Sequence, residues 1–389
     1  MKSIHRTIES SIRYYSKKYP VIAVTGPRQS GKTTMLKNML PDYTYLNLED
    51  PLLREFALNS PKEFFLSYPG KLILDEVQQT PLLFSFIQAK VDATGKMGQY
   101  ILSGSQNFQL MENITQSLAG RVALFKLLPY DLRELKQSGL LTDDYLELLV
   151  KGCYPALYNR AITPKVFFSN YIQTYVEKDL KQLLEVRDLR QFRKFLSLCA
   201  ARCGQLLNLN SLANDCGISQ PTAKAWISVL ESSYIIYLLQ PHYANFNKRV
   251  IKTPKLYFYD TGLLCHLLKI TLASGISMHP LKGSIFENFA LSELIKQNEH
   301  QYLHADFSFW RDSSGHEVDL LTYLDDRLSI TEVKITETIK DDFFKGINYF
   351  SALEGSHVAK KNLIYTGDYS YKKNGMHVTS WKDTNLLIK

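Results

Sequence analysis

The chain has 389 residues, of which 45% are hydrophobic, and it carries a formal net charge of +8 at pH 7. This size predicts two to four domains with buried cores, and the basic balance favours polyanionic partners without requiring them. No apolar run approaches the roughly 18 residues of a membrane-spanning helix. The sequence also begins without a signal-peptide core, so we expect a cytoplasmic protein.

The five cysteines are odd in number and form no C-x-x-C pair, which indicates reduced thiols. Cys199 and Cys203 lie four residues apart on an expected helix, a spacing that would suit a metal ion. Because no partnering Cys or His pair lies close to them in sequence, we expect small core residues instead.

Four regions follow one another along the chain, and together they predict an α/β protein with closely packed domains. Residues 1–135 alternate short apolar runs with helical patterns, as a parallel α/β domain does. Residues 136–190 read as a helical lid or linker, residues 191–275 as a helix-turn-helix region, and residues 276–389 as a second α/β domain. The strands expected in the first region are Val21–Thr25, Tyr43–Leu48, Lys71–Asp75, Tyr100–Ser103 and Val122–Leu127.

A phosphate-binding pattern, G-x-x-x-x-G-K-T, follows the first expected strand in the stretch Gly26-Pro27-Arg28-Gln29-Ser30-Gly31-Lys32-Thr33-Thr34. Glycines let backbone N–H groups wrap phosphates, and the helix that follows presents its positive end. We expect Lys32 to reach the β- and γ-phosphates of ATP and the Thr33 hydroxyl to coordinate Mg²⁺.

Asp75 and Glu76 end the apolar strand that follows the P-loop by some forty residues. An acidic pair at a strand end is often only a solvated turn, but its place after the P-loop favours a role in hydrolysis. We expect Asp75 to bind Mg²⁺ through water and Glu76 to polarise the attacking water.

Two further polar positions follow in this region. Ser105 or Ser103, at the tip of the fourth strand, is expected to contact the γ-phosphate or the attacking water, or else only to cap the next turn. Arg121, just before the fifth strand, is expected to stabilise charge on the γ-phosphate, in its own subunit or in a neighbouring one. A surface or interdomain salt bridge is the alternative for this arginine.

Five stretches of the first region resemble a family of prokaryotic AAA-type ATPases whose C-terminal domain has long been described as being of unknown function. They are Thr25–Thr34, Asn47–Pro51, Leu74–Gln78, Ser103–Gln106 and Ser117–Arg121, and the resemblance continues through Asn245–Lys255 and Tyr259–Leu263. It implies an N-terminal AAA+ domain that binds ATP and Mg²⁺. Such chemistry usually uses a neighbouring arginine, so a homo-oligomer is expected. The family has no settled biological role.

The middle region predicts a DNA-reading element. A short helix beginning at Ser211, a turn at Cys216-Gly217-Ile218 and a second helix capped by Ser219 form a helix-turn-helix. The run 245–255 then resembles the basic wing of a winged helix. The expected nucleic-acid contacts are Thr222, Lys224, Lys248, Arg249 and Lys252. Winged helices also serve as protein–protein modules or as ATPase lids, so these alternatives stay open.

A metal site is predicted in the last region. Glu332 and Lys334 end an apolar strand and share one of its faces, and a hairpin turn brings Asp319 of the preceding strand beside Glu332. Glu287, on a helix over 284–297, points at the same spot. These carboxylates suit Mg²⁺ or Mn²⁺, and Lys334 would orient or deprotonate the attacking water. The other expected elements are strands at 307–311, 316–324, 327–334 and 362–365 and a helix near 338–353.

This order of residues resembles the PD-(D/E)XK nuclease superfamily, onto whose four positions Glu287, Asp319, Glu332 and Lys334 map. The departure is that Asp319 follows Glu317-Val318 and not a proline. The resemblance implies a restriction-endonuclease-like fold. Trp310 and Arg311, on the strand before, are expected to be core and salt bridge.

Three hypotheses follow. The leading one is an ATP-hydrolysing protein that acts on nucleic acid and cleaves DNA with a metal-dependent, nuclease-like C-terminal domain. The second is a nucleotide-switched regulator that binds DNA or protein and carries an inactive nuclease-like domain. The third is an assembly ATPase that moves a protein partner.

Overall fold

The computed structural model describes residues 4–105, 107–176, 189–242 and 253–388. The chain forms two compact units. The first holds the residues up to Tyr130 together with Ser232–Tyr234 and Glu299–Tyr302, and the second holds the rest. In the described part of the chain, no helix combines the length and the apolar character needed to cross a membrane.

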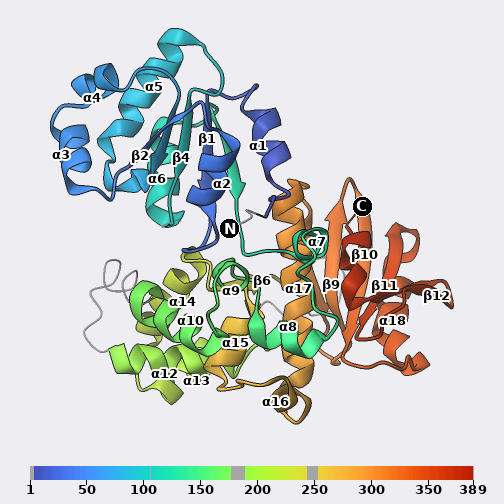
Figure 1. The fold of residues 1–389 in the computed structure, drawn as a ribbon. Coiled ribbons are helices and arrows are strands. Elements are labelled where there is room, and N and C mark those ends of the chain that lie inside the picture. Colours follow the sequence, from blue (N-terminus) through green and yellow to red (C-terminus); the bar gives the residue numbers. More distant parts are fainter. Residues whose placement is uncertain (1–3, 106, 177–188, 243–252, 389) are drawn as a thin grey trace. The chain divides into compact units, whose positions relative to one another are not determined.

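A five-stranded parallel sheet forms the centre of the first unit, with the strand order β2-β3-β4-β1-β5 (Figure 1). The strands are β1 (Val21–Thr25), β2 (Thr44–Asn47), β3 (Leu72–Asp75), β4 (Tyr100–Ser103) and β5 (Val122–Lys126). All five strands expected from the sequence are confirmed, with single residues trimmed at some ends. Alternate residues of β1 enter two separate hydrophobic clusters, Val21 and Ala23 one, Ile22 and Val24 the other. Because both faces of the sheet are covered there, every residue of β1 is buried.

Short helices connect the strands of the first unit. Asp50 caps one of them by accepting hydrogen bonds from the N–H groups of Leu52 and Leu53 at 2.9 and 3.2 Å, and a proline follows at the first helical position. The helices are α1 (Glu9–Tyr15), α2 (Lys32–Met39), α3 (Pro51–Asn59), α4 (Pro61–Ser67), η1 (Val77–Gln79), α5 (Leu82–Thr94) and α6 (Asn107–Ser117).

The second unit begins with a helical region. Its helices are α7 (Leu132–Gln137), α8 (Tyr145–Lys151), α9 (Ala156–Asn159), α10 (Pro164–Tyr171), η2 (Ile172–Val176), α12 (Leu189–Ala200), α13 (Leu209–Cys216), α14 (Gln220–Ser232), α15 (Thr261–Leu267) and α16 (Ala273–Ser277). The helix-turn-helix is confirmed as α13 and α14, with Gly217 in the left-handed conformation of the turn (φ 79°). Its first helix starts at Leu209, before the expected start at Ser211, because Asn208 caps it by accepting a hydrogen bond from the Ser211 N–H. All five cysteines are free and buried.

An antiparallel strand pair and a six-stranded sheet complete the second unit. The pair is β6 (Ile236–Leu239) and β7 (Lys255–Phe258). The six-stranded sheet has the order β12-β13-β11-β10-β9-β8, and its strands are β8 (Asp306–Arg311), β9 (Glu317–Leu324), β10 (Arg327–Lys334), β11 (Val358–Tyr365), β12 (Tyr371–Lys373) and β13 (Met376–Ser380). The hairpin β12–β13 was not expected from the sequence. One expected helix divides into η3 (Asp341–Phe344) and α18 (Lys345–Glu354), and the short helices η4 (Gly355–His357) and η5 (Trp381–Leu386) follow.

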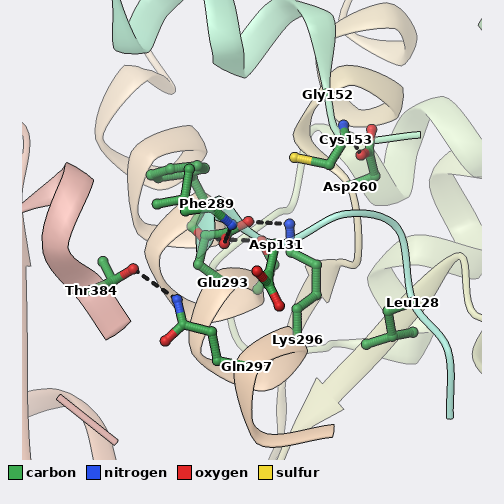
Figure 2. A network of polar contacts seen from close by, with 12 residues as sticks. Leu128, Asp131, Gly152, Cys153, Asp260, Phe289, Glu293, Lys296, Gln297 and Thr384 are labelled. Atoms are coloured by element: carbon green, nitrogen blue, oxygen red, sulfur yellow. Dashed lines mark hydrogen bonds and ion pairs between the residues drawn. The ribbon is translucent and has the colours of Figure 1, made fainter. Parts of the chain in front are cut away.

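The long helix α17 (Lys282–Gln301) carries a buried polar network in the second unit (Figure 2). Lys296 forms an ion pair with Glu293, and both side chains are almost fully buried. Glu293 Oε2 also accepts a hydrogen bond from the Leu132 N–H at 2.8 Å, and the Gln297 amide donates to Thr384 Oγ1 at 3.0 Å. The network therefore ties α17 to two segments far from it in sequence.

Candidate functional site

The phosphate-binding loop lies at the carboxyl end of β1 and leads into α2. Gly26 (φ 141°) and Gly31 (φ 95°) have positive φ angles, and a Cβ atom on Gly26 would lie 2.1 Å from the Leu127 carbonyl oxygen. The buried Arg6 contacts the loop, because its guanidinium donates a hydrogen bond to Ser30 O at 2.8 Å. The two glycines adopt backbone angles that other residues rarely adopt, and the loop leads directly into the first turn of α2. This is the backbone arrangement that binds phosphates.

Lys32 and Thr33 lie at the start of α2, as a nucleotide site needs. Lys32 Nζ donates to the carbonyl oxygens of Gly26 and Pro27 at 2.8 and 2.9 Å. Thr33 Oγ1 donates to Asp75 Oδ2 at 2.7 Å. The predicted Mg²⁺-binding side chains therefore meet, although they lie 42 positions apart in sequence.

Asp75 is buried at the end of β3 and is surrounded by donors. Its Oδ2 atom also accepts from the Tyr45 hydroxyl at 2.7 Å, and Ser103 at the end of the adjacent β4 donates to Oδ1. Burial, together with the hydrogen bond to Asp75, raises the pKa of Tyr45. The tyrosine therefore stays a neutral donor that fixes the carboxylate.

Glu76 follows with a left-handed backbone (φ 51°), which is uncommon for a residue other than glycine. Its Oε2 atom accepts from the Gln78 amide at 2.5 Å and from the Ser105 hydroxyl at 3.1 Å. The two serines of the β4 tip are thus divided, because Ser103 contacts Asp75 and Ser105 contacts Glu76. Sequence reasoning missed the contact of Gln78 with Glu76.

The placement of Arg121 corrects one expectation. It directly precedes β5, and its carbonyl oxygen accepts from the Val21 N–H at the amino end of β1. The P-loop lies at the other end of this strand, so Arg121 does not reach a γ-phosphate held by its own loop. Its guanidinium instead pairs with Asp92, with 2.6 Å between Nε and Oδ1. Action on a neighbouring subunit's nucleotide stays a prediction.

In the second unit, the predicted metal-site residues converge on the six-stranded sheet. Thr331 of β10 pairs with Leu320 of β9, which brings Asp319 to the next position beside Glu332. Asp319 Oδ2 accepts from the Val333 N–H at 2.9 Å, and Lys334 Nζ lies 2.5 Å from Glu332 Oε1. The expected pairing of the two strands and the shared face of the E-x-K pattern are both confirmed.

Glu287, from the second turn of α17, belongs to the same cluster. Burial raises the pKa of its carboxyl, and the negative charge of Asp319 raises that pKa further. Its Oε1 atom is 3.3 Å from Lys255 Nζ and accepts a hydrogen bond from the Tyr257 hydroxyl. Lys255 also forms an ion pair with Glu317.

Burial and mutual repulsion dominate the electrostatics of this cluster. Burial first, and then the negative charge of Asp319, raise the pKa of Glu332 to about 8 and that of Glu287 to about 7. Glu332 Oε2 is buried without a hydrogen-bond partner among the described residues. A buried carboxylate oxygen without a hydrogen-bond partner favours a cation. A divalent ion would offset the repulsion between the carboxylates and would supply the contact that this oxygen lacks.

The cation that sequence reasoning missed is Lys255. It ended a basic run interpreted as a wing, yet it is only 3% exposed and serves the carboxylates. Glu317 and Tyr257 were missed as well. No local pattern marks any of the three, because the contacts join β7, α17 and β9. The two expectations for β8 are confirmed. Trp310 is buried, and Arg311 forms a salt bridge with Glu317 at 3.2 Å.

The expected nucleic-acid contacts are only partly within the described residues. On α14, Lys224 is exposed and Thr222 is half-buried, and the Thr222 N–H donates to Ser219 Oγ at 3.2 Å. Ser219 therefore caps this helix, as expected. Lys248, Arg249 and Lys252 lie outside the described residues, so their contacts stay predictions.

Known families account for most of the chain. Residues 18–136 match the AAA domain, residues 142–274 match a domain of unknown function (DUF8612), and residues 282–383 match another domain of unknown function (DUF4143). Among solved structures, a Walker-type ATPase of Pyrococcus abyssi is 16% identical with a TM-score of 0.43, covering 67% of this chain and 94% of its own. The RuvB Holliday junction branch migration motor of Thermotoga maritima is 18% identical with a TM-score of 0.29, covering 59% and 86%.

Two relatives match over nearly the full chain. An uncharacterized protein of Mycobacterium tuberculosis is 30% identical over 356 residues, which cover 90% of this chain and 78% of the relative. An uncharacterized protein of Mycobacterium bovis matches with the same figures. The chain therefore belongs to one family with these mycobacterial proteins and is a P-loop ATPase of the AAA type, followed by two domains of unknown function.

Proposed function

We propose that this ATPase acts on DNA and that its C-terminal domain cleaves the DNA with the help of a divalent metal ion. The observation that carries the proposal is the convergence of Asp319, Glu332 and Lys334 on one face of the sheet, with Glu287 adjacent. Carboxylates beside a lysine at a strand end are the groups that metal-dependent phosphodiester hydrolysis needs.

The residues of this cluster fit Mg²⁺ or Mn²⁺. The donors are oxygens, which hard divalent ions prefer. Glu332 Oε2, which has no hydrogen-bond partner within the described residues, gives such an ion a ready ligand. Asp319 and Glu332 would hold the metal, which would polarise the phosphate and a bound water. Hydrolysis forms a bond between the water oxygen and phosphorus and breaks the bond from phosphorus to the leaving sugar oxygen. The proton lost by water goes to solvent, and the sugar oxygen takes one from solvent.

Lys334 would orient the water and counter negative charge on the phosphate. The surrounding carboxylates, Asp319 foremost, raise its pKa in spite of burial, so the ammonium form is the stable one beside the cluster. In this form Lys334 donates hydrogen bonds and contributes positive charge. It is therefore suited to stabilising the transition state.

In the first unit, Lys32 and the N–H groups of the P-loop would hold the phosphates of ATP, while Thr33 and Asp75 would hold Mg²⁺. Glu76 would polarise the attacking water, and hydrogen bonds from Ser105 and Gln78 would hold the Glu76 carboxylate in position. ATP binding requires Lys32 to leave its carbonyl partners. We propose that this change controls access of DNA to the second unit.

A nuclease assay with separated variants tests the proposal. Purified protein is incubated with single-stranded, duplex and branched DNA and with RNA, with Mg²⁺ or Mn²⁺, with and without ATP. We expect metal-dependent DNA cleavage that is lost in Lys334→Ala and Glu332→Gln and kept in Lys345→Ala, whose side chain is 77% exposed in the same domain. Intact substrates under every condition would refute the nuclease proposal. If DNA cleavage by Lys32→Ala no longer depends on ATP, the ATP site and the cleavage site perform separate activities.

One observation favours a second candidate, a nucleotide-switched DNA- or protein-binding regulator with an inactive nuclease-like domain. Lys255 and Lys334 both pair with carboxylates of the cluster, so part of its charge is neutralised without a metal. The regulator would bind DNA in an ATP-dependent way without cleaving it. Glu332→Gln would leave that binding unchanged. The result that separates the two candidates is whether the unsubstituted protein cleaves the DNA that it binds.

A further inference from the structure

The side chain of Lys255 enters the carboxylate cluster from a part of the chain outside the six-stranded sheet. It belongs to β7, whose partner is β6. We infer that Lys255 is a built-in cation that occupies the place of a second divalent ion, so that the site binds one metal ion per chain. This inference rests on the proposed metal site and specifies how many ions that site takes.

The position of Lys255 is fixed by backbone contacts on both sides. Its strand pairs with β6 through Leu239 and forms an isolated bridge with Leu206 on the other side. The Leu256 N–H donates to the Gln205 carbonyl at 3.1 Å. The ammonium group also lies over the Phe309 ring, 5.4 Å from its centroid. A cation held in this way stays in place when a metal ion binds to the cluster or leaves it.

The contacts divide the cluster into two halves. In one half, Glu287 has Lys255 and the Tyr257 hydroxyl as partners, and Glu317 has Lys255 and Arg311. These two carboxylates are therefore already neutralised by protein groups. A divalent ion placed between them would have to displace the ammonium group of Lys255, a residue that is only 3% exposed.

The other half is neutralised only in part by protein groups. Lys334 pairs with Glu332 Oε1, and the Val333 N–H occupies Asp319 Oδ2. Glu332 Oε2 is buried without a hydrogen-bond partner among the described residues. A single metal ion is therefore expected between Asp319 and Glu332. The positive charge of Lys255 opposes a second ion nearby.

Counting bound Mn²⁺ on the full chain tests the inference without measuring cleavage. Equilibrium dialysis and the electron paramagnetic resonance signal of free Mn²⁺ give the stoichiometry in the absence of nucleotide, in an Asp75→Asn background that removes the magnesium ligand of the ATP site. We expect one ion per chain, and two in Lys255→Met. The control Lys345→Met, which removes an exposed lysine of the same domain, should keep one.

Each outcome bears on a different statement. Two ions on the unsubstituted site, or one ion on Lys255→Met, would overturn the inference and leave the proposed nuclease intact. No bound ion on the unsubstituted site would refute the proposed metal site itself, and the inference with it. If Lys255→Met does not fold, Glu317→Gln decides. The inference expects one ion with unchanged affinity, because Glu317 serves Lys255 and not the metal, and loss of that ion would contradict it.

Discussion

The buried ion pair of α17 gives a test of what stabilises the second unit. Glu293 and Lys296 have side chains that are 0% and 2% exposed. The substitution Lys296→Met keeps most of the aliphatic volume but leaves Glu293 as a buried carboxylate without its cation. Breaking a buried pair in this way typically costs about 3–5 kcal/mol.

Two features of the site set the expected magnitude. Glu293 Oε2 keeps the hydrogen bond from the Leu132 N–H at 2.8 Å. Burial also raises the pKa of this carboxyl, so protonation removes part of the cost of the unpaired charge. We therefore expect the lower end of the range, a loss of about 3 kcal/mol in the free energy of unfolding. With a urea m-value of about 3 kcal/mol/M, the unfolding midpoint falls by about 1 M.

Tryptophan fluorescence confines this measurement to the right part of the molecule. The chain has three tryptophans, and Trp226, Trp310 and Trp381 all lie in the second unit. Urea unfolding followed by their fluorescence therefore reports on that unit, even where the first unit unfolds separately.

Two further variants make the reasoning refutable. Lys282→Met changes an exposed lysine at the start of the same helix, and we expect it to alter stability by less than about 0.5 kcal/mol. The double variant Glu293→Gln/Lys296→Met removes the unpaired charge, so it should recover at least half of the loss. Equal effects of Lys282→Met and Lys296→Met, or a double variant no more stable than Lys296→Met, would show that the charge pair is not the cause.

Three predictions concern the ATP site. Lys32→Ala should abolish ATP hydrolysis, measured as phosphate release, because the phosphates lose their principal cation; undiminished turnover would refute its role. Ser105→Ala removes one donor to Glu76 and should lower the hydrolysis rate about tenfold while ATP binding, measured by dialysis, is unchanged; an equal loss of binding would contradict a role limited to Glu76. Gly26→Ala places Cβ 2.1 Å from Leu127 O at φ 141° and should cost at least about 1–3 kcal/mol in strain; an unchanged melting temperature would refute the close contact.

The P-loop and the paired strands of the second unit could be predicted because their geometry is local. A glycine-rich loop after a strand determines its own backbone form, and the two-residue turn between β9 and β10 fixes the register that sets Asp319 beside Glu332. Glu287 was predictable for a related reason, because it lies one to two turns into a helix that begins near Gly283. In each case a short stretch of sequence contains the constraint.

The errors have the opposite origin. Lys255 is separated from Glu287 by 32 positions and from Glu317 by more, so no sequence pattern connects them, and its neighbours in the basic run suggested a solvent-exposed role. Arg121 was expected to stabilise charge on the γ-phosphate of its own or a neighbouring subunit because it directly precedes the fifth strand, with a salt bridge as the alternative. The chain returns through α6 to the amino edge of the sheet before β5 begins, and this reversal moves Arg121 away from the P-loop.

The lysines of the two sites differ in how their charge is balanced, and this difference separates a ligand-binding role from a structural one. Lys32 donates to two carbonyl oxygens, which are neutral dipoles, so a phosphate that offers full negative charge competes successfully for it. Lys255 is held by carboxylates with 4% of its side chain exposed, and no incoming anion offers it more than it already has. An exchange of partners is therefore favourable at the P-loop and unfavourable at Lys255. For the same reason, ATP should reorganise the first site, whereas a metal ion should enter the second without moving its built-in cation.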